Sequence, residues 1–311
     1  MRNIAILLAT LNGGKYIKAQ LESLKQQTMQ NFVCYIHDDG SCDNTMELVR
    51  QFQQENPEQF VIVEGAPTGH AKSNFMYLLG HVLGQYEYYM FCDQDDVWLP
   101  DKIEVVYNRI LREEGHEPCL VFSDMKVVNE RLQEIAPSFS EFSHICVEDA
   151  VFPNTMLRGY GAGCTMILNE ALAKLSYVPD TSKLLMHDWW IVLIASLSGK
   201  IYYEDRPLSL YRQHQENVMG AQKRSEWIHF TEIVKRVVTL QQYKVTRKGL
   251  YESIYQVAAL KQVPGLYEQH KELIDGANRI NKMSKLERCR YILKYGIYQN
   301  SYSRYWSCVC I

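Results

Sequence analysis

The sequence predicts an α/β fold in which a mostly parallel central sheet is flanked by helices. Short apolar runs alternate with segments whose apolar residues recur every three or four positions, as in βαβ units. The first run, residues 4–9, contains no polar residue, which is typical of a strand buried on both faces. A hydrophobic fraction of 47% and a charged fraction of 22% are those of a globular protein, so disorder is not expected.

Each predicted element rests on a local pattern. Short apolar runs predict strands at residues 4–9, 32–36, 60–63, 88–91, 120–123, 126–129 and 201–203, and a further apolar run at 164–168 follows a glycine-rich loop. Helical spacing predicts helices at residues 17–24, 46–52, 74–83, 103–110 and 187–198, and a wholly helical region from about residue 224. Asp43 is a candidate cap of the second helix, and Pro100 suits the first turn of the fourth.

Charge and periodicity both change near residue 220. Acidic residues outnumber basic ones before this point and basic residues dominate after it, within a net charge of −3. The sequence therefore predicts a main domain at residues 1–220 and a helical C-terminal extension at 221–311. An acidic main domain argues against nucleic acid as a partner, and the basic extension suggests contact with something anionic.

Cysteine usage and hydropathy indicate a cytoplasmic protein. The nine cysteines include no C-x-x-C pair, so neither a disulfide framework nor a zinc site is expected, and a reducing compartment fits best. The apolar run at residues 4–9 is too short for a signal-peptide core, and no run is long enough to span a bilayer.

A row of aromatic residues marks the end of the chain. The tyrosines at 291, 295, 298, 302 and 305 are spaced four, three, four and three residues apart, which predicts one helical stripe flanked by basic residues. The stripe either packs on the main domain or lies at the inner surface of an anionic membrane, as a peripheral contact.

Three acids follow the apolar run 88–91 directly: Asp93, Asp95 and Asp96. Carboxylates this close repel one another and are costly to desolvate. A divalent cation such as Mg²⁺ or Mn²⁺ that also holds phosphate oxygens would compensate, because both ions prefer oxygen ligands. A solvated Asp-rich turn is the simpler alternative.

Polar residues also follow the first two predicted strands. Thr10 and Asn12 come after the first, and Asp38 and Asp39 after the second. Ligands of open α/β sheets gather at the carboxyl ends of strands, so these residues and the three acids predict one site at one edge of the sheet. The sequence has no G-x-G-x-x-G after the first strand, which argues against a dinucleotide-binding enzyme, and it has no Walker A motif.

Three motifs in this order resemble the inverting family 2 glycosyltransferases: Ala9-Thr10-Leu11-Asn12-Gly13, Asp38-Asp39-Gly40-Ser41, and Asp93-Gln94-Asp95-Asp96 with Trp98-Leu99-Pro100. The resemblance covers roughly residues 3–216. It implies a GT-A fold with a nucleotide-sugar-binding half at about residues 1–125 and an acceptor half at about 126–220. It also implies a nucleotide-sugar donor and Mg²⁺ or Mn²⁺.

The resemblance assigns roles by position. Thr10, Asn12 and Asp39 would contact the nucleoside. Asp95 would bind the metal, and Asp93 would bind either the ribose or the metal.

The resemblance also makes Asp188 the catalytic base, because the family places an acid at the start of a helix after a glycine-rich loop. Such a carboxylate accepts the proton of the acceptor hydroxyl as its oxygen attacks the sugar. An N-cap is the structural alternative. Trp189 and Trp190 are candidate acceptor-binding residues, because aromatic faces suit sugars, although core packing is as good an explanation for one of them.

Four further residues are candidates for the donor site. Lys72 and Asn74 precede a predicted helix, where donors meet anions. Arg212 and His214 follow the last predicted strand, and the resemblance places this region over the diphosphate, so Arg212 would meet phosphate and His214 phosphate or metal. A surface basic pair is the alternative.

The motif His187-Asp188-Trp189-Trp190 together with Tyr211-Arg212-Gln213-His214-Gln215-Glu216-Asn217-Val218 looks like a paired signature of the bacterial rhamnosyltransferases of this family. It implies dTDP-L-rhamnose as donor and a polysaccharide or lipid-linked oligosaccharide as acceptor. A UDP-hexose donor is an alternative. A haloacid-dehalogenase-like phosphatase with Asp93 as nucleophile, and a degenerate domain that only binds, are further alternatives.

Overall fold

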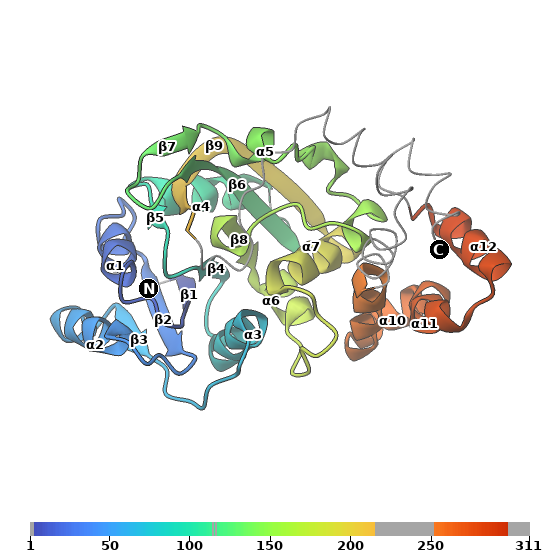
Figure 1. The fold of residues 1–311 in the computed structure, drawn as a ribbon, viewed down its shortest axis with the longest axis horizontal. Coiled ribbons are helices and arrows are strands. Elements are labelled where there is room, and N and C mark those ends of the chain that lie inside the picture. The colour runs from blue at the N-terminus through green and yellow to red at the C-terminus, as the bar shows by residue number, and fades with distance from the viewer. Residues whose placement is uncertain (1–2, 114, 116, 215–251, 298–311) are drawn as a thin grey trace.

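The computed structural model describes residues 3–113, 115, 117–214 and 252–297 (Figure 1). Its described strands form one nine-stranded sheet in the order β3-β2-β1-β4-β8-β6-β9-β5, with β7 paired to β6. The strands are β1 Ile4–Thr10, β2 Phe32–Asp38, β3 Phe60–Ile62, β4 Tyr88–Cys92, β5 Val97–Trp98, β6 Cys119–Val128, β7 Glu134–Ala136, β8 Met166–Asn169 and β9 Lys200–Arg212.

The first half of the chain forms the parallel part of the sheet that the sequence predicts. β1 lies between β2 and β4 and pairs in parallel with both, and β3 extends this part beyond β2. The connecting helices are α1 Ile17–Lys25, α2 Thr45–Glu55, α3 Ala71–Val82 and α4 Lys102–Glu113. The residue before α2 is Asn44 rather than Asp43, whose carboxylate instead accepts hydrogen bonds from Thr45 and Gly14.

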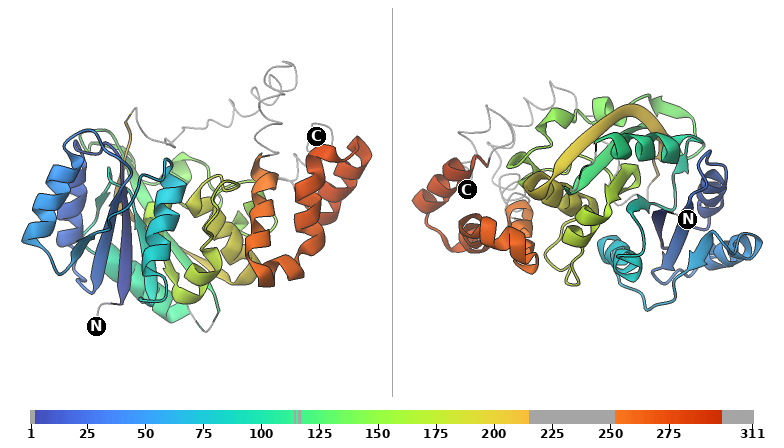
Figure 2. Two further views of the ribbon diagram at one scale, coloured as in Figure 1. Left: turned by 90° about the horizontal axis from the view of Figure 1, so that it is seen from below. Right: turned by 180° about the vertical axis from the view of Figure 1, so that it is seen from behind.

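Helices cover both faces of this sheet, which explains the unbroken apolar run of β1 (Figure 2). Successive side chains of a strand point to opposite faces. Leu7 therefore packs into the core with α3 and α7 (His187–Ser198), and Leu8 into the core with α1, α2 and α4.

The second half is antiparallel where it joins the first. β8 runs antiparallel to both β4 and β6, and β9 then pairs in parallel with β6. The predicted strands 120–123 and 126–129 are one strand, because the Asp124 irregularity shifts the register without ending the ladder. The predicted strand 201–203 continues to Arg212. Two short helices, α5 Phe139–Phe142 and α6 Glu170–Ser176, complete this half.

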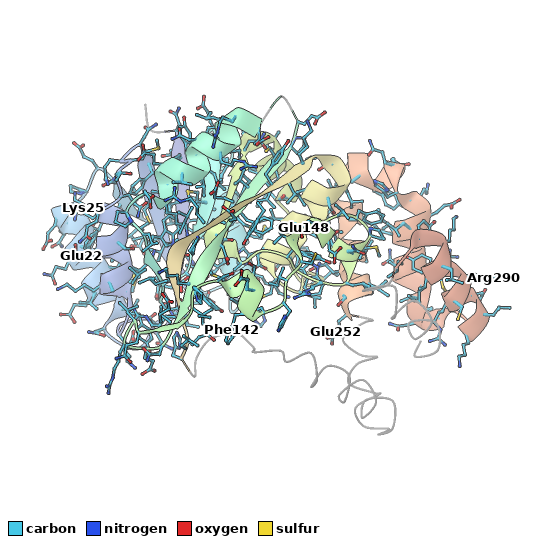
Figure 3. The ribbon with its side chains drawn as sticks, turned by 90° about the horizontal axis from the view of Figure 1, so that it is seen from above. Glu22, Lys25, Phe142, Glu148, Glu252 and Arg290 are labelled. Atoms are coloured by element: carbon cyan, nitrogen blue, oxygen red, sulfur yellow. The ribbon has the colours of Figure 1, made fainter. Side chains whose placement is uncertain are left out.

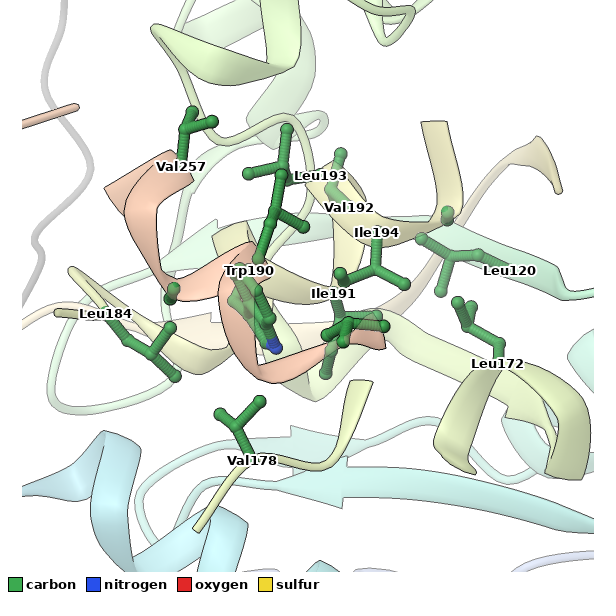
Figure 4. Close-up of a cluster of buried hydrophobic side chains, with 14 of the residues drawn as sticks. Leu120, Leu172, Val178, Leu184, Trp190, Ile191, Val192, Leu193, Ile194 and Val257 are labelled. Atoms are coloured by element: carbon green, nitrogen blue, oxygen red, sulfur yellow. The ribbon is translucent and has the colours of Figure 1, made fainter. Parts of the chain in front are cut away.

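The described part of the C-terminal region packs on the main domain. It contains helical residues 252–256, the 3₁₀ helices η4 Val257–Gln262 and η5 Ile280–Lys282, and the helices α10 Pro264–Gln269, α11 Lys271–Arg279 and α12 Lys285–Tyr295. Val257 shares the core around Trp190, where Leu184 and Val178 also lie (Figure 4). Lys25 on α1 and Arg290 on α12 mark opposite ends of the molecule (Figure 3).

The predicted tyrosine stripe does not form one helix. α12 ends at Tyr295, because Gly296 takes a left-handed conformation with φ 64°. Tyr291 is buried and its hydroxyl donates to the Leu273 carbonyl at 2.7 Å, so this tyrosine packs internally. The other three tyrosines of the stripe lie outside the described residues. Within the described part, no helix has the length and apolar character needed to cross a bilayer.

Candidate active site

The carboxyl ends of β2, β1 and β4 lie side by side and bring the predicted site residues to one edge of the sheet. The loops after β1 and β2 are joined there, because the Asp39 amide donates to the Thr10 carbonyl at 2.8 Å. The Thr10 hydroxyl donates to the carboxylate of Asp38, also at 2.8 Å. Thr10 thus fixes the two strand ends relative to each other.

Asn12 and Asp39 shape the same pair of loops. Asn12 has a positive φ of 49°, its amide donates to the Ser41 hydroxyl at 2.7 Å, and its side chain accepts from the Cys42 amide at 2.8 Å. Asp39 accepts from the Thr68 hydroxyl at 2.9 Å and the Gly69 amide at 3.1 Å. The loops are therefore held in one shape before any ligand binds. A nucleoside contact by these residues stays a prediction.

Gln94 is a residue of this edge that the sequence did not single out. Its side-chain amide accepts from the Leu11 amide and donates to the Leu11 carbonyl, each at 2.9 Å, much as a neighbouring strand would. A Cβ atom on Gly13 would lie 2.1 Å from the Gln94 side-chain oxygen, so only glycine fits there without displacing it. Gln94 therefore ties the loop after β1 to residues 93–96, which we call the acid turn. The only hint in the sequence is a neutral residue inside a run of acids.

The three carboxylates of the acid turn face different surroundings. Asp96 is fully buried: Oδ1 accepts from the Arg212 amide at 3.2 Å, and the Cys164 thiol lies beside the carboxyl group as a further hydrogen-bond partner. Burial and the charge of Asp95 raise the pKa of Asp96 to about 7. Burial, followed by the charges of its two acidic neighbours, raises the pKa of Asp93 well above its usual range.

Asp95 pairs with one of the predicted ligands. Its Oδ2 lies 2.8 Å from Nε2 of His214, and the imidazole stacks on the Tyr16 ring with 4.8 Å between the ring centres. The predicted proximity of His214 to the metal acid is thus present. Metal binding by this pair stays a prediction.

Arg212 binds main-chain carbonyls of the acid turn and of a neighbouring segment. The side chain is buried, and its guanidinium donates to the carbonyls of Asp95 at 2.7 Å and Glu130 at 2.6 Å. These two bonds use two of the five N–H donors of the guanidinium, and a phosphate contact by Arg212 stays a prediction.

The residues present fit a divalent cation. Ligating atoms of Asp93, Asp96 and Cys164 lie within 4.8 Å of one another. Asp93 also belongs to the acid turn together with Asp95, which meets His214. Hard cations such as Mg²⁺ and Mn²⁺ favour the carboxylates over the thiol. Asp93 is common to both sets and is therefore the best-supported ligand.

Asp188 lies at this edge although 92 residues separate it from the acid turn. It is in the first turn of α7, and its Oδ2 accepts from the Gly163 amide at 3.1 Å. Its negative charge contributes to the raised pKa of Asp93, after burial and the other two acids. The neighbouring His187 is buried against Phe75, and burial lowers its pKa.

The two predicted acceptor tryptophans have different surroundings. Trp190 has no exposed surface and its indole donates to the Ser176 carbonyl at 2.7 Å, so its prediction as an acceptor platform is wrong. Consecutive residues of a helix point about 100° apart, so Trp189 and Trp190 lie on different faces of α7 and only Trp190 points into the core. Trp189 is partly exposed, with its indole donating to the Thr155 carbonyl at 2.7 Å.

The remaining two candidates lie at the start of α3. Lys72 donates to the Leu184 carbonyl, and Asn74 is buried with both amide atoms engaged by His37. Donor contacts by Lys72 and Asn74 stay predictions, and the hydrogen bonds of Asn74 indicate a structural role.

Comparisons with known proteins identify relatives of this chain. A family model described as glycosyl transferase family 2 matches residues 5–173. The dTDP-rhamnosyl transferase RfbG of Shigella flexneri is 30% identical over 223 residues, which cover 69% of this chain and 74% of that protein. A UDP-Glc:alpha-D-GlcNAc-diphosphoundecaprenol beta-1,3-glucosyltransferase, WfgD of Escherichia coli, is 22% identical over 61% of this chain and 69% of its own length.

A solved structure resembles the whole fold. Residues 1–349 of TarS from S. aureus in complex with UDP-GlcNAc align with a TM-score of 0.55 and 17% identity, covering 94% of this chain and 80% of that one. Similarity at this level of identity shows a common fold.

The Gln94 bridge can be tested by Gln94→Glu. The substitution would lose the donor to the Leu11 carbonyl and add a fourth carboxyl group to the acid turn, so we expect the free energy of unfolding to fall by about 1–3 kcal/mol. Urea denaturation measures this. Gln54→Glu, which adds the same charge at an exposed position of α2, is the control. Equal stability of the two variants would contradict the bridge.

The raised pKa of Asp96 predicts a pH dependence. An unfolded aspartate releases its proton near pH 4 and folded Asp96 only near 7, so the wild type loses stability as pH rises between these values. Asp96→Asn cannot titrate. Its stability relative to wild type should therefore improve across this window by more than about 1.4 kcal/mol. Denaturation in the presence of a chelator measures the difference. For the exposed Asp205→Asn variant, the free energy of unfolding relative to wild type should not change with pH across this window. A pH-independent difference for Asp96→Asn would refute the raised pKa of Asp96.

Proposed function

The chain belongs to glycosyl transferase family 2, and from this we propose that it is a metal-dependent inverting transferase that moves L-rhamnose from dTDP-L-rhamnose. The acceptor would be a hydroxyl of a bacterial cell-surface polysaccharide or of a lipid-linked oligosaccharide precursor. The GT-A fold expected from the motifs is confirmed by the fold shared with TarS. Family membership also removes the phosphatase alternative and identifies the chain as an enzyme.

One observation carries the proposed mechanism: Asp188 and the acid turn meet at one edge of the sheet. The acid turn would hold the donor diphosphate through a cation, and Asp188 would face the sugar. Asp188 and the acid turn are far apart in the sequence, and the repulsion between their carboxylates opposes folding. Their proximity is therefore better explained by a function than by a gain in stability.

The reaction follows from these positions. Asp188 accepts the proton of the acceptor hydroxyl, and that oxygen forms a bond to the anomeric carbon. The bond from this carbon to the diphosphate breaks, and its electron pair leaves with the diphosphate. A cation held by Asp93 and Asp95, with His214 beside it, would neutralise charge on this leaving group. A single displacement inverts the anomeric centre.

The donor is proposed from similarity. The relative at 30% identity is named a dTDP-rhamnosyl transferase, which supports the rhamnosyl donor. A UDP-hexose is the second candidate, supported by the name of the relative at 22% identity. In either case Thr10, Asn12 and Asp39 would line the nucleoside site, and partly exposed Trp189 the acceptor side.

We also propose that residues 1–220 carry out the transfer and that residues 221–311 form an extension. Exposed Leu286 and Leu293 lie two turns apart on α12 and Arg290 lies between them, which supports a peripheral contact with an anionic membrane. Such a contact would suit a lipid-linked acceptor at the cytoplasmic face. Absence of binding to anionic vesicles at low salt would exclude it.

The role of Asp188 is tested by Asp188→Asn. The amide keeps the shape but cannot accept a proton, so we expect kcat to fall about 10²–10⁴-fold. Binding of nucleotide measured by calorimetry should survive, because the acid turn is unchanged. Asp205→Asn is the matched control. Retained turnover in Asp188→Asn would exclude it as the base.

The donor is tested by thermal denaturation with Mn²⁺ and a panel of dTDP-L-rhamnose, UDP-glucose and UDP-GlcNAc. A ligand at 100 times its Kd stabilises the folded state by about 2.7 kcal/mol, so the true donor should raise the melting temperature most. We expect this to be dTDP-L-rhamnose, and we expect Asp95→Ala to remove the part that depends on Mn²⁺. A larger shift with UDP-glucose would assign the donor to the UDP-hexoses.

A further inference from the structure

Lys102 has no exposed surface, although it begins α4 and carries an ammonium group. The ammonium lies 4.0 Å from the centre of the Trp98 ring and donates to the main-chain carbonyl of Cys164. Desolvating an ammonium costs several kcal/mol unless nearby charges and acceptors compensate. The surroundings of Lys102 must therefore supply that compensation.

Carboxylates of the acid turn provide part of it, although burial still lowers the pKa of Lys102. Asp96 and Asp93 are among the groups whose negative charge acts on Lys102, and the attraction from Lys102 in turn favours the charged form of Asp96. The group formed by Asp93, Asp96 and Cys164 thus has a cation inside the protein.

The other contact of Lys102 leads to Asp188. Cys164 belongs to the turn Gly163–Thr165, which we call the glycine turn. In this turn the Cys164 carbonyl accepts a hydrogen bond from Lys102, and the Gly163 amide donates to the Asp188 carboxylate at 3.1 Å. A Cβ atom on Gly163 would lie 2.4 Å from the His187 ring, so the glycine turn is pressed against the start of α7.

We propose that Lys102 is a positioning residue that fixes the glycine turn and thereby aims Asp188 at the acid turn. This rests on the proposed role of Asp188 as base. A lysine that only balanced buried charge would stabilise the fold and leave the orientation of Asp188 unaffected. The two roles therefore separate in experiments that measure the glycine turn and catalysis as well as stability.

The first test is Lys102→Met, which keeps the length of the side chain and removes the charge and the donor. We expect hydrogen exchange of the glycine-turn amides, followed by mass spectrometry, to accelerate about tenfold or more. We expect kcat to fall about tenfold or more while KM for the donor changes less than about threefold. Lys174→Met, at an exposed position on α6, should change none of these values.

The second test guards against loss of folding in the single variant. Lys102→Met alone leaves Asp96 buried without its charge partner, which destabilises the fold. Adding Asp96→Asn removes that second buried charge, so the double variant should recover stability. We expect this double variant to melt near Asp96→Asn but to keep the fast exchange of the glycine turn and the low kcat. Exchange and kcat equal to those of Asp96→Asn would overturn the proposal, because Lys102 would then only balance charge.

The outcomes also separate this proposal from the proposed function. Suppose that the glycine turn exchanges faster in both variants while the wild type transfers no sugar from any nucleotide sugar. This result would support the positioning role of Lys102 and refute the proposed glycosyltransferase function. Unchanged exchange of the glycine turn in the variants, with an active wild-type enzyme, would refute only the positioning role of Lys102.

Discussion

The acid turn imposes the main constraint on this structure: three carboxylates must be held together at the end of a buried strand. Several unrelated elements provide what this requires. Arg212 donates its amide to Asp96 and its side chain to the Asp95 carbonyl, and Gln94 links the turn to the loop after β1. Lys102 supplies a positive charge from α4. The Arg212 amide and the Lys102 charge offset the repulsion between the carboxylates, and the other bonds hold the main chain of the turn in place.

The antiparallel insertion of β8 explains how a distant residue reaches this turn. Because β8 lies next to β4 in the sheet, the glycine turn that precedes β8 sits beside the strand end that carries the acids. α7 then begins against the glycine turn and presents Asp188. A sheet with parallel strands alone would place this part of the chain behind a crossover helix.

Local patterns were sufficient for much of the fold and for the position of the site. Strand ends at Thr10, Asp38 and Asp93 could be predicted to meet, because parallel strands align their carboxyl ends. Tertiary packing decided the rest. Lys102 in the first turn of an amphipathic helix looks like a solvated residue, and nothing local shows which of Trp189 and Trp190 enters the core. The guanidinium of Arg212 binds carbonyls of two distant segments, which no motif encodes.

The long pairing of β6 with β9 has a consequence for folding order. Arg212 pairs in register with Val128, and its amide reaches Asp96, 116 residues earlier in the chain. Contacts over such separations form late, because closing a long loop costs entropy before any contact rewards it. During synthesis the parallel strands β1, β2 and β4 can assemble before β9 has left the ribosome. The acid turn lacks its Arg212 contacts until β9, the last of the described strands, docks, so we expect this edge of the sheet to be completed late in folding.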